Sequence, residues 1–282
     1  MKLPIVLSYF QVEAILRTKA EGKTSAQAST DLGITSEEVM ISPEGVLFAN
    51  GESLGWGQIK EIGEANRKCF TVENNSIHEI QIFSEDTDWV RSLAPTKGAP
   101  TMLVSGIPMH RIKETDPITD TLTKIKAIEP IVGRVLDTAT GLGYTAIEAA
   151  KTADEVVTVE LDPADLEIAR FNPWSQALFD NPKIIQIVGD SFEVIKSMED
   201  SFFTRIIHDP PTFSLAGELY SQEFYCQLLR VLRKGGRIFH YIGDPESQLG
   251  KRTTPGVIRR LQEAGFARVV RHPEAFGVVA FK

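Results

Sequence analysis

Residues 135–144 constrain the fold of this chain more than any other stretch. An apolar run ends at Asp137, a turn containing Gly141 and Gly143 follows, and the helix-forming residues 145–150 come directly after it. This succession predicts a strand, a tight glycine turn and a helix start, a geometry that lets backbone N–H groups approach a ligand closely. Because many turns contain two such glycines for purely structural reasons, the rest of the chain decides what this turn means.

Strand-like and helix-like segments alternate from residue 134 onward. Apolar runs predict strands at 134–138, 156–160, 184–188, 205–208 and 237–242. Amphipathic segments predict helices at 144–152, 163–171, 174–180, 218–232 and 254–264, and Ser191 is expected to cap a further short helix. The alternation is typical of an α/β fold with a parallel sheet, and the last two runs, 268–271 and 276–281, predict a closing antiparallel hairpin.

The first hundred residues have a different character. Residues 8–40 predict helices, and residues 23–39 look like a helix-turn-helix. Short strands are predicted at 45–49, 69–72 and 77–83, a short helix at 55–62, and a linker at 95–100, which is rich in Pro and Gly. We therefore expect a small α+β accessory module over 1–100 and a larger domain over 101–282. Residues 101–131 lead into that domain, with a helix expected to begin at Pro117 and to bury Ile118, Leu122, Ile125 and Ile128.

Composition narrows the function classes. A net charge of −8 does not suit a broad nucleic-acid surface. In the segment 23–39, Glu37 and Glu38 would be repelled by DNA phosphates, so we favour a structural helical hairpin over a DNA-binding one. The only cysteines, Cys69 and Cys226, lie far apart, which argues against a metal site or a disulfide scaffold and suits the cytoplasm. The apolar run at 3–7 is too short for a spanning helix, so no membrane partner is expected.

Four acidic features are predicted to stand at the carboxyl ends of strands, where ligands bind in open α/β sheets. They are Asp137 with its glycine turn, Glu160, Asp190, and Asp209, which Pro210 and Pro211 follow. A carboxylate at Glu160 can accept both hydroxyls of a ribose, and one at Asp190 can accept an exocyclic amine of adenine. Each feature alone is as readily a surface carboxylate, a helix cap or a rigid turn. Their arrival in order at successive strand ends favours a nucleoside site.

On these residues, the stretch 134–282 resembles class I S-adenosylmethionine-dependent methyltransferases. The resemblance implies a Rossmann-like, seven-stranded, mostly parallel sheet with helices on both faces. It also implies S-adenosyl-L-methionine as cofactor, held by Asp137, Thr138, Thr140, Gly141, Gly143, Glu160, Leu161, Asp190 and Ser191. The whole chain, including residues 105–111, resembles a group of predicted archaeal methyltransferases related to the spermidine-synthase-like branch. That group implies the cofactor without naming the methyl acceptor.

The glycine turn alone does not exclude a dinucleotide. Ala146 stands where a Rossmann fingerprint has its third glycine, and the fingerprint also permits alanine there. Asp190, the Asp209 loop and the closing hairpin favour S-adenosylmethionine.

The resemblance places the catalytic centre at the loop after residue 208. We expect Asp209, Pro210 and His208 to be catalytic, with the carboxylate holding the N–H groups of a nitrogen acceptor. Thr212 stands where amino-group methyltransferases often have an aromatic, which here is displaced to Phe213. His110, Arg111, Phe213 and His240 are candidate substrate contacts; for His208 and His240 a structural histidine at a strand end is an equal alternative. Neither cysteine is placed for cytosine-C5 chemistry.

Three functions stay open. The first is a cytoplasmic methyltransferase acting on a small molecule or RNA, for which a homo-oligomer and a monomer both stay open. The second is an aminopropyltransferase that uses decarboxylated S-adenosylmethionine; Ile206, where that family usually has an earlier acid, weakens it. The third is a nucleic-acid-binding or regulatory module with an inactive methyltransferase fold, which the acidic residues at 37 and 38 count against.

Overall fold

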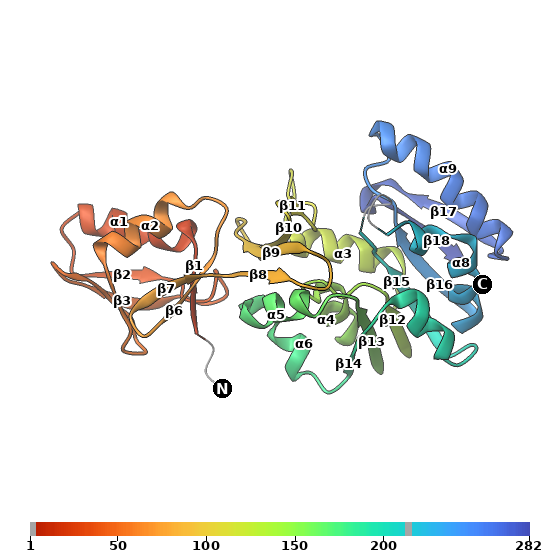
Figure 1. Cartoon of the computed structure of the whole chain (residues 1–282), viewed down its shortest axis with the longest axis horizontal. Coiled ribbons are helices and arrows are strands. Elements are labelled where there is room, and N and C mark those ends of the chain that lie inside the picture. Colours follow the sequence, from red (N-terminus) through yellow and green to blue (C-terminus); the bar gives the residue numbers. More distant parts are fainter. Residues whose placement is uncertain (1–3, 212–215) are drawn as a thin grey trace. The chain divides into compact units, whose positions relative to one another are not determined.

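The computed structural model describes residues 4–211 and 216–282. By their contacts the residues form two compact units, Met1–Ile118 with Ala164–Gln176 and Thr119–Pro163 with Ala177–Lys282. We call these the N-terminal unit and the seven-stranded unit. Figure 1 shows their elements.

Small antiparallel sheets and two helices make up most of the N-terminal unit. The sheet orders are β1-β6-β7, β2-β3-β4-β5 and β11-β10-β9-β8. The elements are β1 (Ile5–Leu7), α1 (Tyr9–Ala20), β2 (Ser25–Ala28), β3 (Glu37–Ile41), β4 (Gly45–Leu47), β5 (Ser53–Gly55), α2 (Trp56–Glu64), β6 (Phe70–Glu73), β7 (Ser76–Glu79), β8 (Gln81–Ser84), β9 (Trp89–Ala94), β10 (Thr101–Val104) and β11 (Ile107–Pro108). Val12, Ile15, Ile59 and Ile62 of the helices share a buried core with strand residues, and the predicted helix at 55–62 is confirmed as α2.

The predicted helix-turn-helix at 23–39 is wrong. Its two halves are β2 and β3, which pair antiparallel with Gln27 opposite Glu38. Ala26 and Ala28 are buried while Gln27 between them is exposed, which is the alternation of a strand. The polar residues that resembled helix caps close the turn instead, because both Asp31 carboxylate oxygens accept hydrogen bonds from Thr35 at 2.8 and 2.6 Å.

Two further expectations for this unit are corrected. The run at 77–83 is not one strand but two, β7 and β8, which belong to different sheets and meet at Ile80. The proline- and glycine-rich residues 95–100 are not a linker between domains. They connect β9 to β10, which pair antiparallel from Ala94 opposite Thr101 to Arg91 opposite Val104.

The seven-stranded unit contains the predicted α/β sheet, in the order β14-β13-β12-β15-β16-β18-β17. Strands β12 to β16 are parallel, and β17 and β18 form the predicted antiparallel hairpin. Helix α3 enters this unit from the N-terminal unit, and α5, η1 and the start of α6 lie outside it. The elements from α3 onward are α3 (Pro117–Ala127), β12 (Arg134–Asp137), α4 (Tyr144–Ala150), β13 (Glu155–Glu160), α5 (Pro163–Phe171), η1 (Pro173–Ser175), α6 (Gln176–Asp180), β14 (Ile184–Val188), α7 (Ser191–Val194), η2 (Ile195–Ser197), β15 (Phe203–His208), η3 (Gly217–Tyr220), α8 (Gln222–Val231), β16 (Leu232–Tyr241), α9 (Gln248–Glu263), β17 (Arg268–His272), η4 (Pro273–Ala275) and β18 (Gly277–Phe281).

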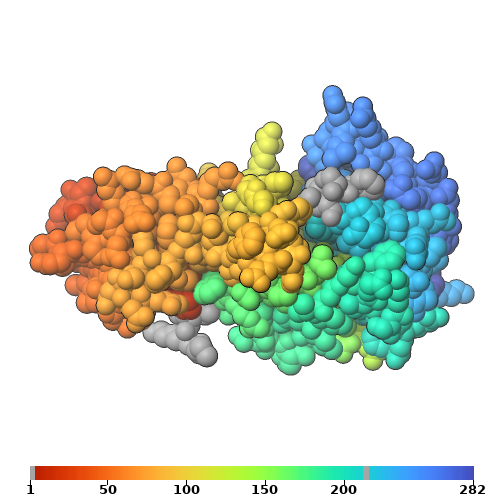
Figure 2. Space-filling model, viewed as in Figure 1, coloured from red at the N-terminus to blue at the C-terminus, as the bar shows by residue number. Residues whose placement is uncertain are grey.

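Both faces of the sheet are covered. Leu136 and Ile206 pack with residues of α8 and α9 in one large core. Their neighbours along the strands, Val135 and Ile207, point to the opposite face and are equally buried. Helix α4 packs on β12, β13 and β14, and α9 lies at the surface of the unit, where it forms a ridge in Figure 2.

Several element boundaries differ from the sequence expectations. Asp190, not Ser191, is the N-cap of α7, and its carboxylate accepts the Phe192 N–H at 2.8 Å. Helix α8 ends at Val231 and β16 begins at the next residue, so residues 234–236 lie inside a strand. Helix α9 begins at Gln248 behind the Ser247 cap, six residues earlier than expected, with Pro255 in its interior.

Candidate functional site

The carboxyl ends of the parallel strands bring together the acidic features that the sequence singled out. Asp137, Glu160 and His208 are the last residues of β12, β13 and β15, and neighbouring strands pair directly. Side chains join these ends across the sheet. Glu160 meets the glycine turn, and Ser191 donates a hydrogen bond to the Thr138 carbonyl at 2.6 Å.

The glycine turn needs glycine for two different reasons. Gly141 and Gly143 have φ angles of 51° and 78°, in the left-handed region. A Cβ at Gly143 would lie 2.7 Å from the Leu178 side chain, so this position is also sterically closed. A Cβ at Gly141 would meet no atom within 4 Å, so the space in front of the turn is open.

Glu160 is fixed by backbone N–H groups. Its Oε2 accepts the Gly141 N–H at 2.8 Å and its Oε1 accepts the Asp162 N–H at 3.1 Å. The side chain is 7% exposed. A carboxylate held in this way is preorganised to accept further donors, such as ribose hydroxyls.

Asp137 is fully buried, and its two carboxylate oxygens have different surroundings. Oδ2 accepts hydrogen bonds from Thr158 at 2.9 Å and Thr145 at 3.2 Å. Oδ1 has no hydrogen-bond partner among the described residues. Burial raises the pKa of Asp137 to about 7, although the bond from Thr158 lowers it, and the negative charge of Asp209 raises it further.

The other predicted cofactor residues are engaged within the protein or stand at the surface. The Thr140 hydroxyl pairs with that of Thr158 at 2.6 Å, and the Thr138 hydroxyl with His208 Nδ1 at 2.7 Å. Asp190 uses one carboxylate oxygen as a helix cap. Leu161, the residue after Glu160, has an apolar side chain that is 59% exposed.

Asp209 does not stand alone, because a buried lysine holds it. Lys124 Nζ lies 2.6 Å from Asp209 Oδ2 and 2.8 Å from Asp120 Oδ2. The exposed fractions of the Lys124, Asp120 and Asp209 side chains are 3%, 0% and 19%. Burial raises the pKa of Asp209; Lys124 opposes this and Asp120 adds to it. For Lys124, burial acts to lower the pKa, but the two carboxylates outweigh it and the pKa is raised.

The sequence expectations missed Lys124 and Asp120. The predicted buried face of this helix included Leu122, which is 45% exposed. The available signal was the spacing of an acid and a lysine four residues apart, which usually marks a solvent-exposed pair.

His208 and His240 have the surroundings of structural histidines. Both are fully buried, and their ring centroids lie 4.3 Å apart. His208 Nε2 donates to the Leu219 carbonyl at 2.9 Å, so Nδ1 accepts from Thr138. Burial lowers the pKa of His208 to about 3, and it also lowers the pKa of His240, whose Nε2 pairs with the Tyr225 hydroxyl at 2.8 Å. A neutral ring with both nitrogens engaged is a poor general base, so His208 suits a positioning role.

The loop after Asp209 is tied down at its second proline. The Tyr220 hydroxyl donates to the Pro211 carbonyl at 3.0 Å, and Tyr220 is itself buried. Pro210 is buried as well. Thr212 and Phe213, on which the expectation about base stacking depends, lie outside the described residues.

His110 and Arg111 belong to the N-terminal unit. His110 Nδ1 pairs with the Thr101 hydroxyl at 3.0 Å, and Arg111 is partly exposed. Their role as substrate contacts stays a prediction.

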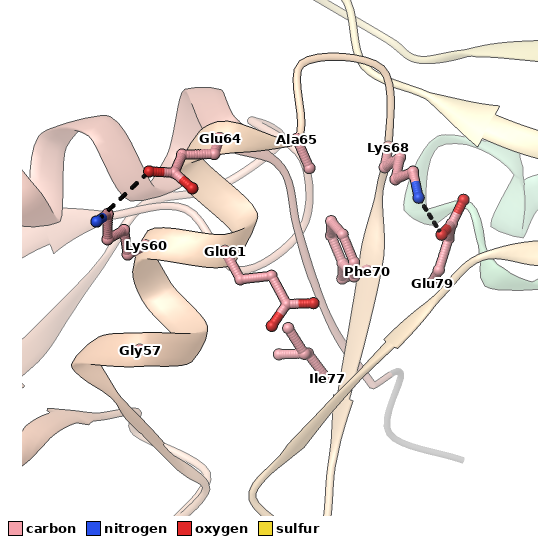
Figure 3. A pocket seen from close by; sticks show the side chains of 9 residues that line it. All are labelled: Gly57, Lys60, Glu61, Glu64, Ala65, Lys68, Phe70, Ile77 and Glu79. Carbon is pink, nitrogen blue, oxygen red and sulfur yellow. Dashed lines mark hydrogen bonds and ion pairs between the residues drawn. The ribbon is translucent and has the colours of Figure 1, made fainter.

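Two cavities are lined by other residues. A groove of 520 Å³ in the N-terminal unit is flanked by the ion pairs Lys60–Glu64 and Lys68–Glu79, and Figure 3 shows Glu61 extending from α2 toward Phe70 and Ile77. A cavity of 210 Å³ in the seven-stranded unit is lined by Ile242 just after β16, and by Pro245, Glu246, Lys251, Thr254, Pro255, Arg271, Pro273 and Gly277. None of the predicted site residues lines either cavity.

Among residues 4–211 and 216–282, no helix is both long and apolar enough to cross a membrane.

Comparisons with known proteins place the chain in a superfamily. An uncharacterized protein of Methanocaldococcus jannaschii is 43% identical over 87% of this chain and 85% of its own length. A polyamine aminopropyltransferase of Mycobacterium tuberculosis is 29% identical over 49% of the chain, and putrescine N-methyltransferase 2 of Nicotiana tabacum is 27% identical over 36%. The chain spans only 27% and 30% of these two relatives.

A comparison with solved structures supports the fold. The crystal structure of spermidine synthase from Thermotoga maritima superposes with a TM-score of 0.56 at 19% identity, over 74% of this chain and 76% of that one. This confirms the Rossmann-like fold. No protein-family profile matches the chain. The chain therefore belongs to the family of the M. jannaschii protein, within the superfamily of S-adenosylmethionine-dependent methyltransferases and spermidine-synthase-like aminopropyltransferases.

Proposed function

We propose that this chain is a cytoplasmic S-adenosylmethionine-dependent methyltransferase whose acceptor presents an uncharged nitrogen, in a small molecule or an RNA. The observation that carries the proposal is the ion pair between Lys124 and Asp209, at 2.6 Å. It bears on the acceptor because the carboxylate that would hold the acceptor already holds a cation.

The residues at the strand ends fit an adenosyl sulfonium cofactor. Asp137 is fully buried beneath the glycine turn, where its Oδ2 accepts hydrogen bonds from Thr145 and Thr158 and so helps to hold the turn that would line the cofactor. Gly141 borders open space, and Glu160 is held by two backbone N–H groups with its carboxylate preorganised. We assign the ribose to Glu160 and the amino-acid part of the cofactor to the side of Asp137, with Asp190 and Leu161 at the adenine. Bound there, S-adenosylmethionine supplies an activated methyl group.

Asp209 would orient the acceptor. Lys124 engages Oδ2, and among the described residues Oδ1 makes no hydrogen bond. Oδ1 can therefore accept an N–H from the acceptor and turn the nitrogen lone pair toward the methyl group, and the prolines at 210 and 211 limit movement of the loop. His208 is neutral and both of its ring nitrogens are hydrogen-bonded, so it would support the loop and would not exchange protons with the acceptor.

The same ion pair disfavours a cationic acceptor. An ammonium bound at Oδ1 would lie about 5 Å from Lys124 Nζ, and two positive charges so placed repel by about 3 kcal/mol at an effective dielectric constant of 20. A diamine acceptor would lose roughly half of its attraction to Asp209 in this way. The aminopropyltransferase alternative is further weakened because Ile206 is fully buried in the core where that family usually has an acid.

Incubation of the full chain with methyl-labelled S-adenosylmethionine and fractionated cell extract tests the proposal. Label should enter one pool of RNA, protein or small molecules. Asp209→Asn should lower transfer at least about 100-fold while cofactor affinity, measured by calorimetry, changes less than about threefold. Asp200→Asn, a 76% exposed aspartate ahead of β15, is the matched control.

Two outcomes would contradict the proposal. Transfer of an aminopropyl group from decarboxylated S-adenosylmethionine to putrescine, with no methyl transfer to any pool, would establish the alternative. If calorimetry detects no binding of S-adenosylmethionine or of its decarboxylated form, both the methyltransferase and the aminopropyltransferase functions are excluded.

A further inference from the structure

A buried charged cluster lies at the start of the seven-stranded unit. Asp120 and Lys124 lie one turn apart on α3, and Lys124 Nζ bridges the carboxylates of Asp120 and Asp209 at 2.8 and 2.6 Å. The ammonium also lies 4.7 Å from the centre of the Tyr241 ring, close enough for a cation–π contact. Lys124 is thus held from three elements: its own helix, the loop after β15, and β16.

Folding stability alone does not account for such a cluster. Desolvating a lysine and two carboxylates costs free energy that their mutual attraction only partly returns, and well-packed apolar residues often do as well or better. An apolar residue at position 124 would simply extend the buried positions Ile125 and Ile128 on this helix. The cluster ends at Asp209, the one member with an exposed fraction above a few per cent.

We propose that Lys124 is a positioning residue, which keeps the Asp209 carboxylate ionised and fixes its orientation so that Oδ1 faces the acceptor. Asp120 anchors Lys124 and adjusts the strength of its hold on Asp209. The inference rests on the proposed function in one respect only, that Oδ1 is where the acceptor binds.

The two α3 residues act on Asp209 with opposite sign. Lys124 stabilises the ionised form of Asp209 by charge and by a hydrogen bond, whereas Asp120 is a like charge. Asp137 on β12 and Tyr220 on η3 are also electrostatically coupled to Asp209, and Tyr241 on β16 faces the cluster through Lys124. His208, the neighbouring residue, is neutral. Removing Lys124 should therefore raise the pKa of Asp209, and removing the Asp120 charge should lower it.

Carbon-13 NMR of the full chain, labelled at its aspartate carboxyl groups, measures the titration midpoint of Asp209 directly. Asp209→Asn assigns the resonance by its disappearance. Lys124→Met should move the titration midpoint of Asp209 up by about one to three pH units, and Asp120→Asn should move it down. Lys126→Met, an exposed lysine two residues further along the same helix, should leave it in place.

Opposite signs separate positioning from a general structural effect. Local unfolding would move the Asp209 midpoint toward its ordinary value in both variants, so a shift of the same sign in both would overturn the proposal. No shift in Lys124→Met would also overturn it. If Lys124→Met does not fold, the double variant Asp120→Asn/Lys124→Met removes the buried charges together. Its Asp209 midpoint should still lie above that of the unaltered protein, and a midpoint at or below it refutes the role of Lys124.

The titration and the methyl-transfer assay fail independently. The NMR experiment needs no acceptor, so it decides the role of Lys124 even if no labelled pool is found. Methyl transfer that survives in Lys124→Met with an unchanged pH profile would refute positioning and leave the methyltransferase proposal standing. In the positioning account, the acid limb of that profile moves to higher pH together with the Asp209 resonance.

Discussion

Replacing Asp137 by asparagine should stabilise the protein at pH 8 far more than at pH 5. The carboxyl is fully buried, one oxygen accepts from Thr145 and Thr158, and the other has no partner among the described residues. Burial raises its pKa from 3.8 to about 7. Asparagine keeps the acceptor oxygen for the threonines and removes the charge.

The sign and size follow from proton linkage. The folded chain keeps the Asp137 proton to a higher pH than the unfolded chain does, so this contribution to stability is complete below about pH 4. It is lost progressively as the pH rises to about 7, and then stays constant. A difference of about 3 pH units at 1.36 kcal/mol per unit corresponds to roughly 4 kcal/mol. About 3 kcal/mol of this falls between pH 5 and pH 8.

Equilibrium urea unfolding of both proteins at pH 5 and pH 8, followed by circular dichroism, measures the gap between them. Comparison of the two proteins is essential because the lowered pKa values of His208 and His240 give an opposite pH dependence, which both proteins share. The exposed Asp180→Asn serves as control. At each pH, the free energy of unfolding of Asp137→Asn is compared with that of the unaltered protein. If this difference changes by less than about 0.5 kcal/mol between pH 5 and pH 8, the buried-acid reasoning is refuted.

Two further substitutions test the strand-end site. Glu160→Ala should weaken S-adenosylmethionine binding by about 3 kcal/mol, roughly 100-fold, because the charged acceptors for the ribose are lost. Calorimetry measures the affinity, with the exposed Glu193→Ala as control. An unchanged affinity in Glu160→Ala would show that Glu160 does not bind the ribose. Gly143→Ala should lower the thermal midpoint more than Gly141→Ala. Both carry the left-handed backbone penalty of about 1–2 kcal/mol, but only the Cβ at 143 meets Leu178; equal midpoints would count against that steric account.

The sheet was predictable because its signals are local. Apolar runs of strand length alternate with amphipathic helices from residue 134 onward, and parallel strands place their carboxyl ends at one edge. Asp137, Glu160 and Asp209 could therefore be grouped from the sequence alone. The closing hairpin β17–β18 followed from two short apolar runs separated by a proline.

Other features depend on contacts that no local pattern records. Lys124 is buried because Asp209, 85 residues later, completes its surroundings, and a periodicity argument on α3 selects Leu122 in its place. The hairpin at 25–41 looked helical because Ser, Thr and Asp cap helices and close turns with the same hydrogen bonds. The break at Ile80 between β7 and β8 arises from pairing with two different sheets.

The segment Ala164–Gln176 connects β13 to β14, yet it belongs by its contacts to the N-terminal unit. There Asp165 forms a buried ion pair with Arg91, and the Trp174 indole donates to the Leu32 carbonyl at 3.1 Å. No single truncation point therefore separates the two units of this protein. A fragment that starts at residue 119 would carry this crossover without Arg91 and Leu32, and the nearer of the two lost contacts, at Asp165, is five residues after Glu160. Loss of cofactor binding in such a truncation would report a severed crossover, not a binding role for the deleted residues.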